Sequence, residues 1–325
     1  MSAKVTSLIH DVMDAAERLN AGQLVAFPTE TVYGLGADAL NVTAIARLFE
    51  AKQRPEFDPL IVHIAAFDYL SSVAADVPDS ARELAHHFWP GPLTMVLPKR
   101  SAIPDLVTAG LPGVGVRIPE HPLALQLLST VDCPVAAPSA NRFGAVSPTT
   151  AEHVLHGLHG RIDAVLAGGS CRIGLESTVI SLMQQDPVVL RLGGLPLEEI
   201  QTVTGPIQVM TGNPALSDAA QPAPGMLSRH YAPGATVVTV DADTAIQSTD
   251  RRTALLTWGT DPDNRDQFFA VENLSVSGKL AECAANFFAG LRKLDSENPD
   301  VIIARRFPDR GLGRALNDRL QRACG

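Results

Sequence analysis

The chain has 325 residues, of which 46% are hydrophobic and 19% are charged, and its formal net charge is −9. This length favours two domains, and the composition is that of an ordinary globular protein. Because an acidic chain repels the phosphates of nucleic acids, a broad surface that binds RNA or DNA tightly is not expected.

Apolar periodicity and turn residues predict alternating helices and strands up to about residue 205. In chain order we expect a helix at 10–20, a strand at 24–27, a helix from Asn41 or Thr43 to 51, a strand at 60–64, a helix at 80–88, strands at 93–98 and 115–118, a helix at 122–128, a strand at 135–137, a helix at 151–158, and strands at 164–167, 178–182 and 188–192. Since the two kinds of element alternate irregularly, the fold class is α/β with a mixed sheet.

A Pro/Gly-rich stretch at 211–234, with few large apolar side chains, predicts a linker. Beyond it we expect strands at 236–240 and 253–258, a helix at 279–294, a strand at 301–304 and a helix at 313–324. The predicted organisation is an α/β domain with a mixed sheet over 1–205, a linker over 206–234 and a small α/β domain over 235–325.

The cysteines and the first residues indicate a cytoplasmic protein. None of the four cysteines forms a Cys-x-x-Cys pair or has metal-ligand spacing, so we expect reduced thiols. The start is polar and amphipathic rather than a signal segment, and no apolar run approaches the ~20 residues of a membrane helix. We therefore expect no membrane partner.

Lys52 and Arg54 follow a predicted helix and come just before Pro55. At a helix C-terminus two cations are mildly stabilising without any ligand. These two, however, lie between a glycine-containing turn at 34–36 and a buried strand, where a loop opens at the edge of a sheet. Cations in such a loop can clamp phosphates as a point charge and a fork.

Ser139 and Asn141 follow a strand and a proline. Both residue types are common in turns, so the pattern alone fits either a turn or a hydroxyl and an amide that meet a ligand. Ser147 and the run Glu176-Ser177-Thr178 add further polar groups, more than turns alone require.

Other patterns exclude familiar sites. The glycines at 34 and 36 match a dinucleotide fingerprint only partly, because no acid ends a second strand at the required distance, and 169–174 lacks the Lys-Ser/Thr of a P-loop. The histidines at 153, 156 and 159 indicate a solvated helix end rather than a metal site, and His63 alone would be a core histidine. No nucleophile and base stand together, which favours catalysis by positioning and electrostatics.

At these residues the chain resembles the threonylcarbamoyl-AMP synthase family in its long two-domain form. The matching segments are 28–36, Lys52-x-Arg54-Pro55, 59–63, 115–119, 137–141, 176–179, 190–191, the linker pieces 224–226 and 229–233, and the tail 311–320. The resemblance covers nearly the whole chain. It implies a YrdC-like twisted mixed sheet with a concave site, followed by a small C-terminal Rossmann-like α/β domain.

The resemblance also implies a nucleotidyltransferase reaction. L-threonine, bicarbonate and ATP, with Mg²⁺, would give L-threonylcarbamoyladenylate and pyrophosphate. Downstream transfer proteins would use this product to modify adenosine 37 of ANN-decoding tRNAs. No tight direct binding of tRNA is expected of this chain.

Residue roles follow from the resemblance in the same way. Lys52 and Arg54 would be catalytic, and the ATP site would consist of Lys52, Arg54, Asp58, Ser139, Asn141, Ser147, Arg191, His230 and Tyr231. Threonine would be bound by Thr31, His63, Arg117 and Ser177, and no residue is assigned to metal. Asp58 stands where the family often has Asn, Gly113 where it often has Thr, and Leu227-Ser228 where it has a more basic and aromatic pair.

Two alternatives stay open at this point. A YrdC-like domain could bind structured RNA without synthase activity, although the acidic balance disfavours this. A carbamoyl-transfer enzyme for hydrogenase maturation shares the domain, but such proteins normally add zinc-finger and acylphosphatase-like regions, and this sequence shows neither.

Overall fold

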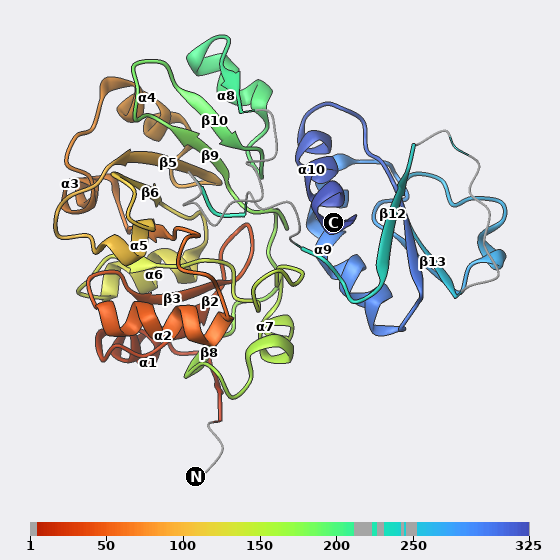
Figure 1. Cartoon of the computed structure of the whole chain (residues 1–325), viewed down its shortest axis with the longest axis horizontal. Helices are drawn as coiled ribbons and strands as arrows, with labels where there is room; N and C mark the ends of the chain where they lie inside the picture. Colours follow the sequence, from red (N-terminus) through yellow and green to blue (C-terminus); the bar gives the residue numbers. More distant parts are fainter. Residues whose placement is uncertain (1–4, 211–222, 226–230, 242–243, 245–251, 325) are drawn as a thin grey trace.

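The computed structural model describes residues 5–210, 223–225, 231–241, 244 and 252–324 of the chain. Two lobes lie side by side, a larger one that contains the N-terminus and a smaller one that contains the C-terminus (Figure 1). Each lobe is built around its own sheet, and the smaller lobe is called the C-terminal domain below.

The larger lobe contains a mixed sheet, as predicted. Among the described residues its order is β1-β8-β2-β3-β7-β4-β6-β5-β9-β10-β11, with both parallel and antiparallel neighbours. The strands are β1 (Ser7–Ile9), β2 (Val25–Phe27), β3 (Gly34–Asp38), β4 (Ile61–His63), β5 (Leu93–Pro98), β6 (Gly113–Arg117), β7 (Val135–Ala136), β8 (Ala164–Leu166), β9 (Thr178–Ser181), β10 (Val188–Arg191) and β11 (Gln208–Val209).

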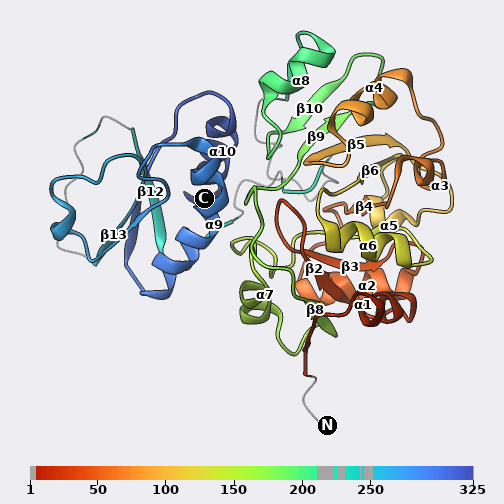
Figure 2. The same cartoon turned by 180° about the vertical axis from the view of Figure 1, so that it is seen from behind.

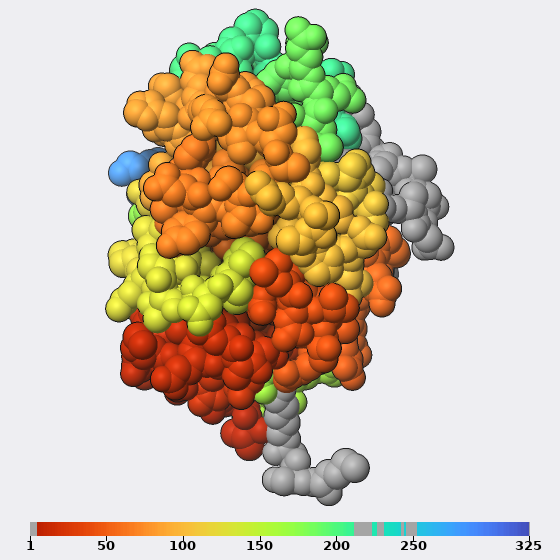
Figure 3. Space-filling view, turned by 90° about the vertical axis from the view of Figure 1, so that its left-hand side faces the viewer, coloured from red at the N-terminus to blue at the C-terminus, as the bar shows by residue number. Residues whose placement is uncertain are grey.

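Helices cover this sheet. They are α1 (Val12–Asn20), α2 (Val42–Lys52), the 3₁₀ turn η1 (Phe67–Tyr69), α3 (Leu70–Val73), α4 (Asp79–Phe88), α5 (Asp105–Thr108), α6 (Pro122–Thr130), α7 (Ala151–Leu158) and α8 (Leu197–Thr204). On the face that points away from the C-terminal domain, α1 packs against α6, red and yellow-green in Figure 3.

Local sequence explains where α2 begins and ends. Of the two predicted caps, Asn41 is the one used, since its side chain accepts a hydrogen bond from the backbone N–H of Ala44. Gln53 adopts a left-handed conformation directly after Lys52 and ends the helix. This turn directs the chain from α2 toward β4, so that Lys52 and Arg54 lie beside the middle of the sheet.

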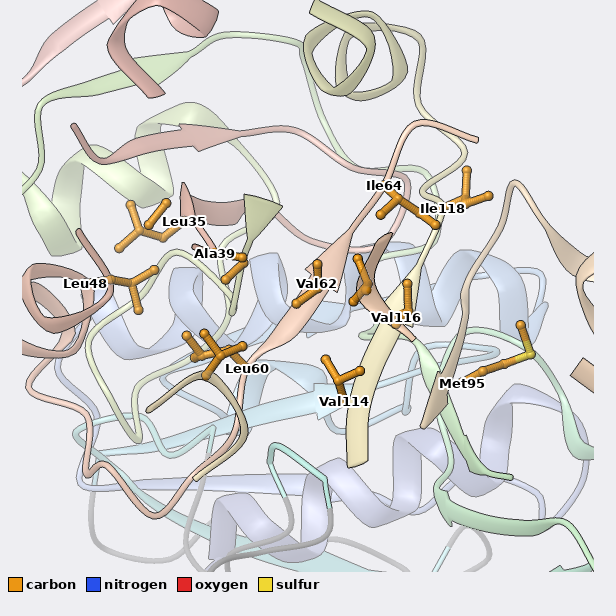
Figure 4. Close-up of a cluster of buried hydrophobic side chains, with 14 of the residues drawn as sticks. Leu35, Ala39, Leu48, Leu60, Val62, Ile64, Met95, Val114, Val116 and Ile118 are labelled. Carbon is orange, nitrogen blue, oxygen red and sulfur yellow. The ribbon is translucent and has the colours of Figure 1, made fainter. Parts of the chain in front are cut away.

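The core between α2 and the sheet is apolar. Leu48 of α2 belongs to one buried cluster with Leu35, Val62 and Val116 of the strands, and all four side chains are fully buried (Figure 4). Each such side chain contributes about 1.5–3 kcal/mol by leaving water. This packing fixes the central strands on which the site described below is built.

The C-terminal domain has a parallel sheet of order β12-β15-β13-β14, which fits the expected Rossmann-like domain. Its elements are β12 (Thr236–Val240), β13 (Thr253–Thr257), the 3₁₀ turn η2 (Arg265–Gln267), β14 (Ala270–Asn273), α9 (Leu280–Ser296), β15 (Val301–Arg305) and α10 (Leu312–Cys324). The helices α9 and α10 face the larger lobe in both views (Figures 1 and 2).

Apolar and ionic contacts join the two lobes. Leu175 of the larger lobe shares a buried cluster with Phe287 and Phe288 of α9. At the edge of the contact, Arg314 of α10 pairs with Glu198 of α8 at 3.3 Å. The two lobes are therefore held by side chains that are far apart in sequence.

One sequence prediction is wrong at a position that matters. The glycine-containing turn expected at 34–36 is strand β3, which pairs antiparallel with β2 and places Val25 opposite Gly36. A Cβ on Gly36 would lie 3.0 Å from the ring of Phe27, so this strand requires glycine for close approach. A dinucleotide-binding turn is thereby excluded here.

The elements missed in sequence were short or weakly apolar: β1, β3, β11, β14, α3, α5 and α8. All four cysteines are free thiols, as expected. Within the described part of the chain, no helix is long and apolar enough to cross a lipid bilayer.

Candidate active site

A cavity at the centre of the larger sheet brings together most of the residues predicted for the site. Its volume is about 50 Å³, below the range of small-molecule pockets, so its walls or cover must move before a ligand of ordinary size can enter. The predicted residues that line it are Thr31, Arg54, His63, Arg117, Ser139, Ser177, Arg191 and Tyr231. Lys52, Asp58, Asn141 and Ser147 do not line it and contact its wall from behind, while His230 lies outside the described residues.

Lys52 joins the two motifs that the sequence predicted to share a pocket. Its ammonium donates hydrogen bonds to the backbone oxygens of Ser139 and Asn141, the latter at 2.6 Å. The residue is 1% exposed, and burial, followed by repulsion from Arg54, lowers the Lys52 pKa well below its ordinary value. A negative ligand beside it would favour its charged form.

Arg54 is held in place by its own loop. Its guanidinium pairs with the carboxylate of Asp58 at 2.9 Å and donates to the backbone oxygen of Pro59 at 2.9 Å. Asp58 is fully buried, and this burial raises its pKa while Arg54 and Lys52 oppose the rise. The aspartate that departs from the family pattern therefore offsets part of the local positive charge.

Asn141 and Ser147 shape the wall of the cavity rather than pointing into it. The amide of Asn141 donates to the backbone oxygens of Arg142 and Ala145, both at 2.8 Å, and so closes the turn. The hydroxyl of Ser147 donates to Glu176 at 2.6 Å. Ser139 does line the cavity, and it bridges to Gly34 of β3.

A second polar group gathers around Arg117 at the end of β6. The guanidinium donates to the hydroxyl of Thr31 at 2.9 Å and pairs with the buried carboxylate of Glu30 at 2.5 Å. His63 of β4 lies beside Arg117 in register. Burial, helped by the charge of Arg117, lowers the His63 pKa to about 3, so its ring is neutral at physiological pH.

Arg191 connects this wall to the segment that covers the cavity. It donates to the backbone oxygen of Ser177 at 2.8 Å and to that of Pro224 at 2.7 Å. Ser177 in turn shares a hydrogen bond of 2.8 Å with Thr94 of β5. The bond to Pro224 ties the covering segment to the sheet.

Tyr231 closes the cavity on the side of the C-terminal domain. It is 1% exposed and packs on Phe288 of α9, with ring centroids 5.4 Å apart. Gly225 has φ 74°, and a Cβ there would lie 2.7 Å from the Tyr231 hydroxyl, so only glycine fits without displacement. Burial raises the Tyr231 pKa to about 12.

Sequence reasoning gave no role to several residues that the structure brings to the site. Glu30 and Glu176 were visible only as parts of matching motifs, and both are buried carboxylates paired with arginines, Arg117 and Arg319. Thr29 lines the cavity and bonds the Thr31 hydroxyl at 2.8 Å. A buried carboxylate needs a partner cation, and that requirement is the signal that could have identified the two glutamates.

Metal ligands do not cluster in the described part of the chain, where no group of three or more His, Cys, Asp and Glu side chains could hold an ion. The three histidines of α7 and its end form no such group. What the cavity offers is a rim of cations on one side and an arginine with hydroxyls on the other. Such an arrangement suits a phosphate chain and a small molecule with a carboxylate.

Two family models match adjoining parts of the chain. The model described as telomere recombination, of the Sua5/YciO/YrdC family, matches residues 17–193, and the model of the threonylcarbamoyl-AMP synthase C-terminal domain matches residues 195–325.

Named relatives and solved structures agree with these matches. The chain is 43% identical to the threonylcarbamoyl-AMP synthase of Pyrococcus abyssi (96% of this chain, 93% of the relative) and 42% identical to that of Bacillus subtilis (97% and 93%). A crystal structure of P. abyssi Sua5 complexed with L-threonine superposes with a TM-score of 0.89 at 41% identity and covers 99% of this chain and 98% of that one.

Proposed function

The chain belongs to the threonylcarbamoyl-AMP synthase family in its two-domain form, and we propose that it makes L-threonylcarbamoyladenylate and pyrophosphate from L-threonine, bicarbonate and ATP. It is in these terms an enzyme of the nucleotidyltransferase class. The observation that supports this most directly is a single cavity lined both by Arg117, Thr31 and His63 and by Arg54 and Arg191. The first group fits an amino acid, and the two further arginines fit a nucleotide.

Threonine is assigned to the wall around Arg117. The guanidinium is already oriented by Glu30 and by the backbone oxygen of Gly91, so it can meet a carboxylate without losing rotamer freedom. Thr31 and Ser177 offer hydroxyls for the amino acid, and the neutral His63 can hydrogen-bond without adding charge. These residues can therefore bind a small, polar co-substrate such as an amino acid.

The nucleotide is assigned to the part of the cavity lined by Arg54 and Ser139, with Lys52 directly behind it. Arg191, which donates to Ser177, lies between this part and the threonine residues. Phosphates at this position would replace part of the hydration that burial has removed from these cations. Tyr231 covers the same region, and His230, which lies outside the described residues, is assigned beside it.

The reaction then requires the protein to align the substrates and stabilise charge rather than to form a covalent intermediate. The threonine nitrogen takes up the carbon of bicarbonate to form a carbamate and water, and a carbamate oxygen attacks the α-phosphorus as pyrophosphate leaves. Charge that builds up on the phosphates in this step is stabilised by Lys52 and Arg54, which the fold holds in place beforehand.

A divalent ion fits this site only together with the nucleotide. Mg²⁺ is often held by substrate phosphates and one or two carboxylates, and Asp58 is a buried carboxylate beside the cation that would meet the phosphates. Asp58 lies behind Arg54 and would act on the ion through its charge rather than from the cavity lining, and the ion would offset phosphate charge when bound. No dedicated cluster of protein ligands is required.

Water must be kept out, since carbamates and acyl-adenylates hydrolyse readily. The cover made by Pro224, Gly225 and Tyr231 supplies that exclusion, and the bond from Arg191 to Pro224 is the contact that would break when the cover opens. The product would pass to transfer proteins that modify tRNA. A cytoplasmic location and the lack of tight tRNA binding stay predictions from the sequence.

The test is to incubate the protein with ATP, threonine and bicarbonate and to search for threonylcarbamoyl-AMP by mass spectrometry. We expect pyrophosphate release that depends on both threonine and bicarbonate. Release that is indifferent to threonine would contradict the proposal.

A further inference from the structure

Arg319 of α10 is fully buried at the contact between the two lobes. Its guanidinium pairs with Glu176 of the larger lobe at 2.9 Å and donates to the backbone oxygen of Leu192 at 2.9 Å. It also pairs with Asp318 of its own helix. The Arg319 guanidinium therefore bonds groups of both lobes, and its three partners fix its orientation.

The partners of Arg319 belong to the wall and cover of the cavity. Glu176 lines the cavity, and its second oxygen accepts the hydrogen bond of the Ser147 hydroxyl. The Arg319 guanidinium carbon also lies 5.2 Å from the centroid of the Tyr231 ring, which is a cation–π contact. Arg319 therefore touches the two groups that bound the nucleotide side.

Every residue that lines the cavity, within the described part of the chain, comes before residue 232. The C-terminal domain thus supplies no lining group there and acts on the cavity through contacts behind its wall. Among these, Arg319 alone of the charged side chains of α10 in the described chain is fully buried. It is the charged side chain through which α10 meets the site, beside the packing of Phe288 of α9 on Tyr231.

We propose that Arg319 is a positioning residue for the nucleotide, by which the C-terminal domain sets Glu176, and through it Ser147, and holds the Tyr231 ring over the cavity. This inference rests on the proposed function for the identity of the ligand, ATP. Through Arg319, the C-terminal domain would contribute to nucleotide binding although none of its residues lines the cavity.

The alternative is that Arg319 only stabilises the contact between the two lobes and does not affect nucleotide binding. Arg314 provides the matched control, since it lies on the same helix and also pairs across the contact, with Glu198, but reaches no group of the cavity. If docking were all that mattered, Arg314→Gln and Arg319→Gln would change the same quantities.

The experiment compares the full-length wild type, Arg319→Gln, Arg319→Lys and Arg314→Gln in steady-state synthesis. We expect Arg319→Gln to raise the KM for ATP at least about tenfold, as expected from losing charge-assisted hydrogen bonds, with the KM for threonine changed less than about twofold. Lysine keeps the charge but not the fork, so Arg319→Lys should fall between Gln and wild type. Arg314→Gln should change neither constant.

The outcome that overturns the inference is a KM for ATP in Arg319→Gln equal to that of Arg314→Gln. Should Arg319→Gln fail to fold because Glu176 is left buried and unpaired, the double variant Glu176→Gln/Arg319→Gln removes both charges. It is expected to fold and still to bind a non-hydrolysable ATP analogue more weakly than wild type by calorimetry. Binding as tight as wild type would refute the role.

The two proposals fail in different ways. If the wild type makes no threonylcarbamoyl-AMP, the proposed function is wrong, whatever Arg319 does. If the wild type is active and the Arg319 variants bind and use ATP normally, only the positioning role is wrong.

Discussion

The ammonium of Lys52 lies 2.6 Å from the backbone oxygen of Asn141, although 89 residues separate them in sequence. The same ammonium donates to the backbone oxygen of Ser139. A buried cation between two carbonyls fixes the turn that follows β7 against the end of α2. The helix end and the turn are therefore one structural unit beside the cavity.

Replacement of Lys52 by Met should remove most of the synthase activity. Methionine keeps the apolar volume but removes a preorganised positive group next to the phosphates, so we expect kcat/KM to fall by about a hundredfold or more. Threonine-dependent pyrophosphate release measures it. The control is Lys99→Met, which removes a lysine paired with Asp105 outside the cavity lining and should leave the rate unchanged.

Replacement of Arg117 by Lys should weaken threonine selectively. Lysine cannot reproduce a fork that contacts Thr31, Glu30 and a ligand at once, so the KM for threonine should rise about tenfold or more. Steady-state titration of threonine at saturating ATP measures the effect. Arg172→Lys, at an exposed pair with Glu120, is the matched conservative change, and equal behaviour of the two variants would argue against the assignment.

His63 makes the stability of the protein depend on pH. Its pKa is about 3 in the folded protein and about 6.5 when unfolded, so between these values the unfolded chain binds more protons. Stability contributed by this residue is therefore present above pH 6.5 and is lost as the pH falls toward 3. Between pH 7 and pH 5 the loss should be on the order of 2 kcal/mol.

The variant His63→Gln isolates this contribution, because all other titrating groups are shared with the wild type. Urea unfolding at pH 7 and at pH 5 should show a smaller loss of free energy of unfolding in the variant, by about that 2 kcal/mol. An identical loss in both proteins would mean that His63 is not a buried neutral histidine.

Much of this site could be read from the sequence, because its cations and hydroxyls follow predicted strands and a predicted helix. Lys52 and Ser139 are examples: each comes just after an element whose apolar pattern is clear. Their shared contact could not be derived from spacing, since 87 residues separate them and only the strand order, with β3, β7 and β4 adjacent, brings them together.

Other parts could not be predicted for physical reasons. Strand β3 has five residues with two glycines, so neither its propensity nor its alternation resembles a strand. The pairing of Glu176 with Arg319 joins two domains, and nothing local in either segment specifies it. Such long-range contacts depend on how two complete lobes fit together.

Replacement of Gly225 by Ala should impair the cover. The φ of 74° costs an L-residue about 1–2 kcal/mol, and the new methyl would also meet the Tyr231 hydroxyl at 2.7 Å. We expect kcat/KM for ATP to fall about tenfold, and a larger share of turnovers to end in hydrolysis. Coupling is measured as threonylcarbamoyl-AMP formed per pyrophosphate released.

Gly144→Ala separates strain from crowding. Gly144 has φ 77°, but a Cβ there has no neighbour within 4 Å. If this control impairs coupling as much as Gly225→Ala, backbone strain rather than the contact with Tyr231 is responsible.

Replacement of Asp58 by Asn tests the place of the metal ion. The amide keeps the shape but removes the negative charge beside Arg54, so the Mg²⁺ concentration for half-maximal activity should rise several-fold, because the surroundings of the ion lose one anion. Activity is titrated with Mg²⁺ at fixed ATP, and chelation of the ion should abolish it. If the Mg²⁺ requirement is unchanged, the role of Asp58 is only to neutralise the charge of Arg54.

The bond between Glu176 and Arg319 spans 143 residues. During synthesis on the ribosome, the segment before β9 that bears this carboxylate is complete long before its partner emerges. A nascent or prematurely terminated chain thus has Glu176 on the uncovered face of its first lobe, without the arginine that pairs with it. Late nonsense mutations should accordingly be as harmful to the cell's supply of active protein as early ones, even though they spare every residue that faces substrate.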